Sequence, residues 1–123
     1  MTLAASLLVI GRIIFGLFFL IAGIRNFSHF SGRKNSKTNY GWSLPTILAA
    51  LGFAVQIVGG LSLIFGLWTV FGALALIIFL VLATSLFHNL FLFEGDERNP
   101  HLYFTLVNIT LVGGLLMVIA EAL

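Results

Sequence analysis

The sequence has few charged residues and no cysteine. Only 8% of its 123 residues are charged, whereas a soluble domain carries roughly 25%. A soluble globule of this size could not hide so much apolar surface, because surface dominates in small proteins. The absence of cysteine excludes disulfides, thiolate metal sites and cysteine nucleophiles. The net charge of +2 comes from few residues and does not make a general basic surface for nucleic acid. The natural solvent of this chain is therefore lipid.

The motifs that identify most enzymes are also missing. The sequence contains no H-E-x-x-H metal motif, no G-x-S-x-G nucleophile motif and no credible catalytic triad. Most of its glycines lie inside apolar segments, and none is part of a phosphate-binding motif. We predict no catalytic residue and no metal site, and we lean against enzymatic activity for the isolated chain.

Long apolar segments dominate what is present. A membrane-spanning helix needs about 20 mostly apolar residues. A helix of a soluble bundle would show a polar stripe, and segment 70–87 shows none. The sequence therefore predicts an all-α bundle of four transmembrane helices that forms a single domain over residues 1–123. The predicted helices cover residues 3–24, 44–66, 70–92 and 102–122.

The distribution of basic residues predicts an orientation. Four spans place both termini on one face of the membrane and the loops 25–43 and 93–101 on the other. Cytoplasmic loops are enriched in lysine and arginine. The loop face carries all the basic residues except Arg12, so we expect cytoplasmic loops and termini outside. These basic residues are Arg25, Arg33, Lys34, Lys37 and Arg98.

Glycines recur at intervals of seven residues within the predicted helices. Seven residues make about two helical turns, so each set lines one face. Small residues let helix backbones approach closely in lipid. We therefore predict that the glycines mark helix–helix contacts, although the same faces could admit a flat ligand. The predicted packing residues are Gly16, Gly23, Gly52, Gly59, Gly66, Gly113 and Gly114.

Several motifs resemble the DoxX family of small four-helix membrane proteins. They are R-I-I-F-G-L-F-F-L-I-A-G from Arg12 to Gly23, Q-I-V-G-G-L-S-L-I-F-G-L-W-T from Gln56 to Thr69, and the F-H pair that ends at His88. The resemblance covers roughly the first 90 residues. It implies a bacterial or archaeal plasma-membrane protein, and some relatives are subunits of quinone-linked oxidoreductases. The family usually has Glu where this chain has Gln56 and Lys where it has Asn26, so a role that needs a carboxylate in the second helix does not carry over.

Four polar residues inside the spans are candidate functional groups, since polar side chains are costly in the bilayer. They are Arg12, Gln56, His88 and Asn108. Arg12 lies about nine residues into its span, near mid-membrane, where a charge costs at least ~2.5 kcal/mol. We expect Gln56, at similar depth, to accept a hydrogen bond from it. These residues are either clamps between helices or hydrogen-bond partners of a quinone, the one cofactor that we consider. For Arg12, an anion is the other possible ligand.

Three histidines are expected at the loop face. His29 follows the first helix, His88 ends the third and His101 begins the fourth. Such residues could bind a metal or a quinone headgroup, but interfacial histidines are more often solvated or cap a helix. Of the three, only His88 is clearly inside a span, which argues against a haem held by two histidines.

The loop 31–43 carries the chain's basic cluster. Basic residues at a cytoplasmic surface attract anionic lipid, and tryptophan is typical of the interfacial aromatic belt. We expect this loop to anchor the protein to the membrane surface or to dock an acidic partner surface. The residues concerned are Arg33, Lys34, Lys37 and Trp42.

Small size, missing catalytic motifs and glycine-lined faces favour an accessory or structural subunit of a larger membrane complex. The family resemblance makes a redox or electron-transfer complex the favoured host, with other membrane subunits and the lipid bilayer as partners. The main alternative is a quinone-binding subunit of a quinone-linked oxidoreductase. A small transporter or lipid-binding protein is a weaker alternative, because four short helices leave little space for a transport path.

Overall fold

The structure is a computed structural model that describes residues 1–33, 36–87 and 95–123. Its four long helices are each long and apolar enough to cross a membrane. The described residues form no β-strand, so the predicted all-α, four-helix membrane architecture is confirmed. The long helices are α1 (Leu3–Ser28), α3 (Thr46–Phe65), α4 (Thr69–Phe87) and α5 (Arg98–Ala122), and the short ones are α2 (Phe30–Arg33) and the 3₁₀ helix η2 (Gly95–Glu97).

The helix boundaries differ from the predicted ones where polar residues continue a helix. α1 runs to Ser28, beyond the predicted end at residue 24, because its polar last turn stays hydrogen-bonded. α5 begins at Arg98, before the predicted start at residue 102. Pro45 is the N-cap of α3 and lies outside its first turn. The predicted end of the third span, residue 92, lies outside the described residues.

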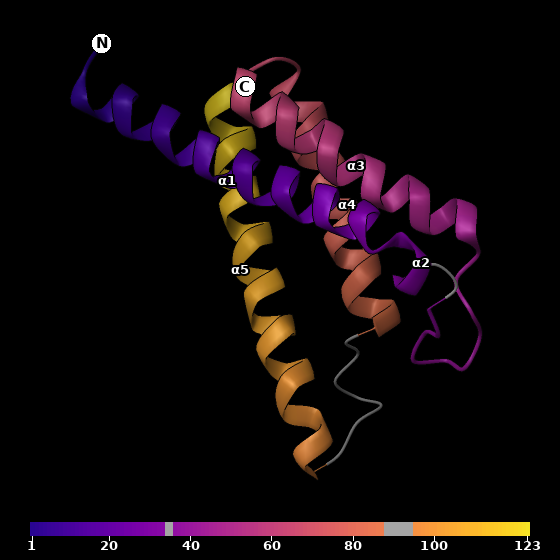
Figure 1. The fold of residues 1–123 in the computed structure, drawn as a ribbon. Coiled ribbons are helices and arrows are strands. Elements are labelled where there is room, and N and C mark those ends of the chain that lie inside the picture. The colour runs from indigo at the N-terminus through magenta and orange to yellow at the C-terminus, as the bar shows by residue number, and fades with distance from the viewer. Residues whose placement is uncertain (34–35, 88–94) are drawn as a thin grey trace.

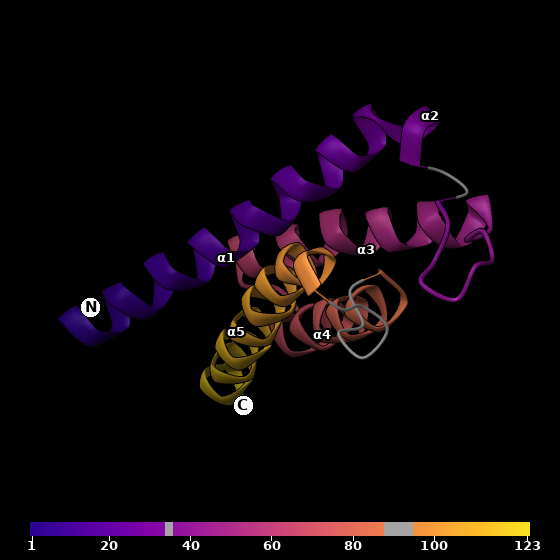
Figure 2. The ribbon, with the colours of Figure 1, turned by 90° about the horizontal axis from the view of Figure 1, so that it is seen from below.

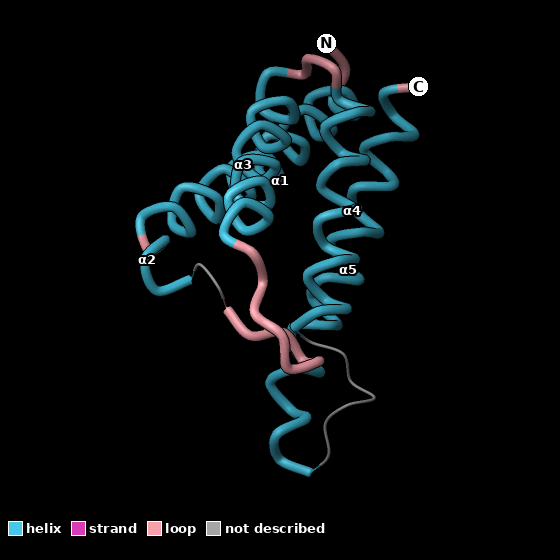
Figure 3. The backbone as a smooth tube through the Cα atoms, turned by 90° about the vertical axis from the view of Figure 1, so that its right-hand side faces the viewer, coloured by secondary structure: helices cyan, strands magenta, loops and turns pink. Residues whose placement is uncertain are grey.

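The helices form two crossed pairs. α1 and α3 run antiparallel and side by side, and α4 and α5 form a second layer beneath them (Figures 1 and 2). The short turn between α3 and α4 joins the two layers. This turn and both ends of the chain lie at one end of the bundle, which we call the terminal face (Figures 1 and 3).

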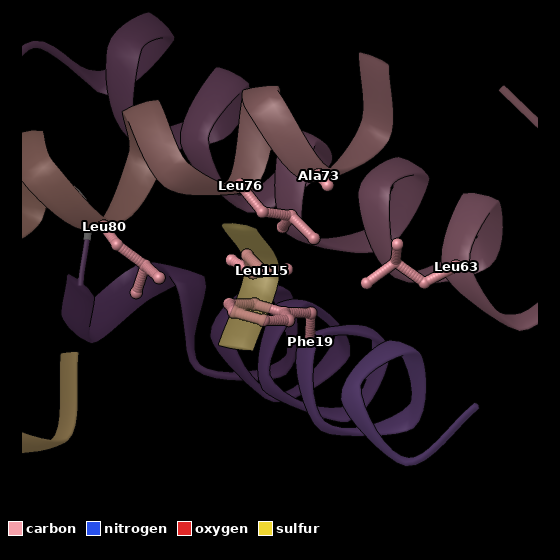
Figure 4. Close-up of a cluster of buried hydrophobic side chains, with 6 residues drawn as sticks. All are labelled: Phe19, Leu63, Ala73, Leu76, Leu80 and Leu115. Carbon is pink, nitrogen blue, oxygen red and sulfur yellow. The ribbon is translucent and has the colours of Figure 1, made fainter. Parts of the chain in front are cut away.

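The buried core is small and draws on all four long helices. The buried apolar side chains at its centre point toward one another (Figure 4). Many large apolar side chains remain exposed, with Phe71 73% exposed, for example. Lipid is the solvent for such a surface, since helices in a bilayer associate by close packing and not by hiding apolar area. The core residues are Phe19, Leu63, Ala73, Leu76, Leu80 and Leu115.

The seam between α1 and α3 is a backbone contact. A Cβ atom added at Gly16 would lie 2.6 Å from the carbonyl oxygen of Gly60, and one added at Gly60 would lie 2.7 Å from that of Gly16. Further along the seam, a Cβ at Gly23 would lie 3.0 Å from the Phe53 carbonyl oxygen. Any side chain at these positions would push the two helices apart.

The remaining glycines divide into packing and non-packing positions. Gly52 and Gly59 of α3 face Phe79 and Leu76 of α4. Gly114 of α5 faces the ring of Phe15 on α1. These three glycines therefore make contacts between helices, as predicted. Gly113 departs from the prediction, because a Cβ there would meet nothing within 4 Å among the described residues. Gly60, absent from the predicted packing set, makes one of the closest contacts.

The turn between α3 and α4 is built on two left-handed residues. Gly66 (φ 68°) ends α3 as its C-cap, a conformation that glycine adopts without steric cost. Trp68 also has a positive φ of 51°. The hydroxyl oxygen of Ser62 lies 2.5 Å from the Leu67 carbonyl oxygen and 3.1 Å from that of Trp68. Gly66 therefore caps α3 within the turn, and it also contacts α1, because an added Cβ atom would lie 3.0 Å from the guanidinium carbon of Arg12.

Residues 36–44, which precede α3, form a compact loop. The Thr38 N–H donates to the Trp42 carbonyl at 2.9 Å, and the Leu44 N–H donates to the Ser36 carbonyl at 2.9 Å. The Asn39 N–H donates to the Leu86 carbonyl at 2.7 Å. This last bond ties the loop to the final turn of α4, so the loop is held against the second helix layer.

Candidate functional site

Arg12 lies against the end of α3. Its Nε–H donates to the Leu63 carbonyl oxygen at 2.9 Å. The guanidinium rests on Gly66, where a Cβ atom would lie 3.0 Å from the guanidinium carbon. A cation at a helix C-terminus interacts favourably with the carbonyl groups that have no partner within the helix. Arg12 therefore joins α1 to α3 at the terminal face.

Gln56 is paired with Asn26. The Asn26 Nδ2 donates to Gln56 Oε1 at 2.6 Å, and Gln56 is only 5% exposed. Two neutral amides thus bond to each other in the α1–α3 seam.

The predicted hydrogen bond from Arg12 to Gln56 is wrong. Gln56 lies ten residues before Gly66 in the sequence, which is about 15 Å along a helix. Arg12 reaches Gly66, and Gln56 reaches the level of Gly23. The prediction failed because counting residues from a helix start gives a position along that helix, and α1 extends past the end of α3 (Figure 1). Arg12 is therefore beside the α3–α4 turn and not at the depth of Gln56.

Asn108 joins α5 to α4. Its Nδ2 donates to Thr84 Oγ1 at 2.8 Å. This pair lies one turn before the end of α4, toward the face opposite the termini (Figure 1). A hydrogen bond between neutral side chains is a common way for transmembrane helices to associate.

The histidines do not form a metal site within the described residues. His88 lies outside the described residues, so its role stays a prediction. His29 is the C-cap of α1, and its Nδ1 lies 2.9 Å from the Arg25 carbonyl oxygen. His101 lies in the first turns of α5 and accepts a hydrogen bond from Thr105 at its carbonyl oxygen, at 2.8 Å. No cluster of three or more His, Cys, Asp or Glu occurs in the parts of the chain that are described.

The basic loop is only partly placed. Lys37 is exposed, and Trp42 is 45% exposed beside it. Arg33 ends α2, and Lys34 lies outside the described residues. The exposed pair is compatible with contact to a membrane surface, and its role stays a prediction.

A cavity opens at the terminal face between the first half of α1, the end of α5 and the start of α4. Its volume is about 350 Å³. Apolar side chains line most of it, and the polar groups are Arg12, Glu121 and the buried Thr69. Among the described residues, neither Arg12 nor Glu121 makes an ion pair. The cavity therefore holds two opposite charges that do not neutralise each other by direct contact.

A larger apolar groove lies between α3 and α4. Its volume is about 730 Å³. Ser62 is the one hydroxyl side chain on its wall, and its proton already serves the turn carbonyls. The groove offers apolar surface and no group for acid–base chemistry.

The predicted polar candidates do not form one site. Arg12 lies at the α3–α4 turn, Gln56 lies beside Gly23 in the α1–α3 seam, and Asn108 lies near the end of α4. Each is hydrogen-bonded to another helix. The three bonds thus lie at three separate places between helices.

Sequence reasoning missed the partners of these residues. Asn26 was noted as a family departure, but its bond to Gln56 was not foreseen. Thr84 was not singled out, although a threonine inside an apolar run is a signal for an interhelical hydrogen bond. Glu121 lines the cavity together with Arg12, and no motif in the sequence predicts this position for it.

Comparison with known proteins gives one match. No curated protein and no solved structure matches the chain significantly. The DoxX family model matches residues 7–89, which include most of α1, all of α3 and α4, and the Arg12 and Gln56 motifs. This match covers more than half of the chain, and the chain therefore belongs to the DoxX family of membrane proteins.

Proposed function

We propose that this chain is an accessory subunit that packs against partner helices in a larger membrane complex. What supports the proposal is the use of the intramembrane polar groups. Arg12, Gln56 and Asn108 are each engaged in a bond between two helices of the chain. Side chains used in this way hold helices together and leave little for catalysis.

The outer surface supports the same proposal. α5 contains one buried residue, Leu115, over its 25 residues. Most large apolar side chains of the chain are exposed, so wide apolar helix faces are open to lipid or to partner helices. The host complex that we propose carries out redox or electron-transfer chemistry, which is what the family resemblance implies.

Purification tests this proposal. The tagged chain is extracted from its native membranes in a mild detergent, and the co-purifying chains are identified. We expect larger subunits to co-purify in fixed stoichiometry. We also expect the turnover of the complex to be unchanged when this chain carries Arg12→Leu. Isolation of the chain alone, with quinone reduction or oxidation by the pure protein, would contradict the accessory role.

The second candidate is quinone binding near the end of α4. The Asn108–Thr84 pair favours it, because Thr84 lies four residues before His88 in the sequence and Asn108 brings an amide to Thr84. The discriminating variant is His88→Leu, with His101→Leu as the matched control on the next helix. A quinone role predicts loss of quinone turnover in the first variant only, whereas an accessory role predicts no change in either.

The plasma-membrane location and the orientation belong to the same proposal, with the loops in the cytoplasm and the termini outside. The absence of cysteine allows a direct test. Single cysteines at Thr2 and Lys37 are treated with an impermeant thiol reagent in intact cells. We expect labelling at Thr2 alone, and labelling at Lys37 alone would reverse the orientation.

A further inference from the structure

The terminal-face cavity carries a second inference, independent of the accessory role. It is a half-open cavity of about 350 Å³ between α1, α5 and the start of α4, and apolar side chains such as Leu8 and Met117 line it. Arg12 and Glu121 both line it. A cavity with apolar walls and two separate opposite charges matches an amphiphile whose headgroup carries both signs.

The position of Arg12 fits a phosphate. The Leu63 carbonyl holds its Nε–H at 2.9 Å, which fixes the guanidinium, and its Nη groups have no bond to another described residue. Guanidinium groups bind phosphate oxygens with two parallel hydrogen bonds. Thr69, the first residue of α4, lines the same cavity, and the positive end of that helix adds to the attraction for an anion. Two independent features thus favour negative charge at this point.

The position of Glu121 fits an ammonium group. Glu121 lies in the last turn of α5, seven residues beyond Gly114, which is about 10 Å along the helix. Gly114 contacts Phe15 of α1, and Arg12 lies one turn from Phe15 toward the terminal face, about 4.5 Å. Glu121 therefore lies farther out than Arg12. A phospholipid headgroup has the same order, because its phosphate is next to the glycerol and its amine is farther toward water.

We propose that this cavity binds a phospholipid with a phosphoethanolamine headgroup. The Arg12 guanidinium binds the phosphate, the Glu121 carboxylate accepts hydrogen bonds from the primary ammonium, and an acyl chain lies against the apolar wall. A primary ammonium donates three hydrogen bonds, whereas the trimethylammonium of choline donates none. An anionic headgroup such as phosphoglycerol lacks the ammonium and meets the negative charge of Glu121.

The test measures lipid retention by the full-length chain after delipidation in a mild detergent. Phosphatidylethanolamine, phosphatidylcholine and phosphatidylglycerol with the same acyl chains are added in turn, and bound lipid is counted by native mass spectrometry. We expect phosphatidylethanolamine to be retained most strongly. Arg12→Gln should weaken its binding about tenfold, as loss of a charged hydrogen bond does. The matched control, Arg25→Gln on the same helix but outside the cavity, should leave retention unchanged.

Glu121→Gln makes the test independent of folding, because Glu121 is exposed and makes no bond to a described residue. This variant should lose the preference for phosphatidylethanolamine over phosphatidylglycerol while keeping affinity for both. Equal retention of phosphatidylethanolamine by wild type and Arg12→Gln, or a wild-type preference for phosphatidylglycerol, would overturn the proposal. Free phosphoethanolamine is the soluble probe, and binding as tight as that of the lipid would overturn the role of the acyl chain.

Discussion

α1 and α3 bring their backbones together at Gly16 and Gly60, whereas α4 and α5 meet through side chains such as Leu80 and Leu115. The first pair has glycine on both helices at the contact. In the second pair, Gly113 of α5 faces open space among the described residues. The difference teaches that a glycine in a transmembrane helix permits close helix contact but does not by itself mark one.

The two helix pairs also differ in the number of hydrogen bonds that side chains make between the helices. The α1–α3 pair has two, from Arg12 to the Leu63 carbonyl and from Asn26 to Gln56. The α4–α5 pair has the Asn108–Thr84 bond. We therefore expect α1 and α3 to form the rigid part of the bundle and α5 to be the helix most easily displaced.

The largest expected effect comes from filling the α1–α3 seam. Gly16→Leu inserts a side chain where the Gly60 carbonyl already lies, so we expect a loss of about 3 kcal/mol of stability, the upper range for overpacking. Unfolding in detergent, followed by circular dichroism, measures it. Gly11→Leu is the control on the same helix, because a Cβ at Gly11 meets nothing within 4 Å. Equal stability of the two variants would show that the backbones of α1 and α3 are not in tight contact at Gly16. The α1–α3 pair would then not differ from the α4–α5 pair.

The next effect concerns the buried amide pair. Gln56→Leu leaves the Asn26 amide without its 2.6 Å partner, and we expect a loss of ~1–3 kcal/mol. The double variant Asn26→Leu with Gln56→Leu removes both partners and should be less destabilised than the sum of the single variants. Strict additivity in this cycle would show that the two amides do not interact.

A smaller effect is expected at the α4–α5 pair. Replacing Asn108 by Leu and Thr84 by Val, singly and together, should give a coupling of about 0.6 kcal/mol, typical of hydrogen bonds between transmembrane helices. Thr110→Val is the control, because the Thr110 hydroxyl donates at 2.8 Å to Leu106 of its own helix. A coupling as large as that of the Asn26–Gln56 pair would make the two helix pairs equivalent.

The smallest effect is expected at Gly113. Gly113→Ala adds a Cβ to open space and improves helix propensity, so stability should rise by at most ~1 kcal/mol. Its neighbour Gly114 is the matched comparison, because the added atom there meets the Phe15 ring. Thermal unfolding of the two variants should therefore differ in sign. Destabilisation at both positions would place α5 in a tight seam like that of α1.

Much of the fold could be predicted because it depends on composition. The apolar runs determine the number of spans, and Gly16 and Gly23 lie on the seam as their spacing suggests. The spacing could not say which neighbour each face meets. Gly59 faces Leu76 of α4, and the adjacent Gly60 faces α1. One residue turns a helical position by about 100°, so two adjacent glycines serve two different helices.

The candidate site was harder to predict because it depends on how far helices slide past one another. Arg12 and Gln56 are both well inside their spans, yet they lie at different levels because α1 extends past α3 (Figure 1). The cost of a polar side chain in the bilayer is enough to predict that Arg12, Gln56 and Asn108 need partners. Their partners, such as Thr84 and the Leu63 carbonyl, depend on register, which no local pattern in the sequence records.

The bond between Arg12 and Leu63 also bears on how the helices enter the membrane during synthesis. The two residues are 51 positions apart, so Arg12 is made long before its partner carbonyl exists. Until the bond forms, the Arg12 guanidinium lies in an apolar helix without this partner, and an arginine in such a helix costs up to ~2.5–3.5 kcal/mol. We therefore expect the nascent first helix to wait at the lipid–water boundary, or in the insertion machinery, until the end of the second spanning helix emerges. The pair would then enter the bilayer together as a hairpin.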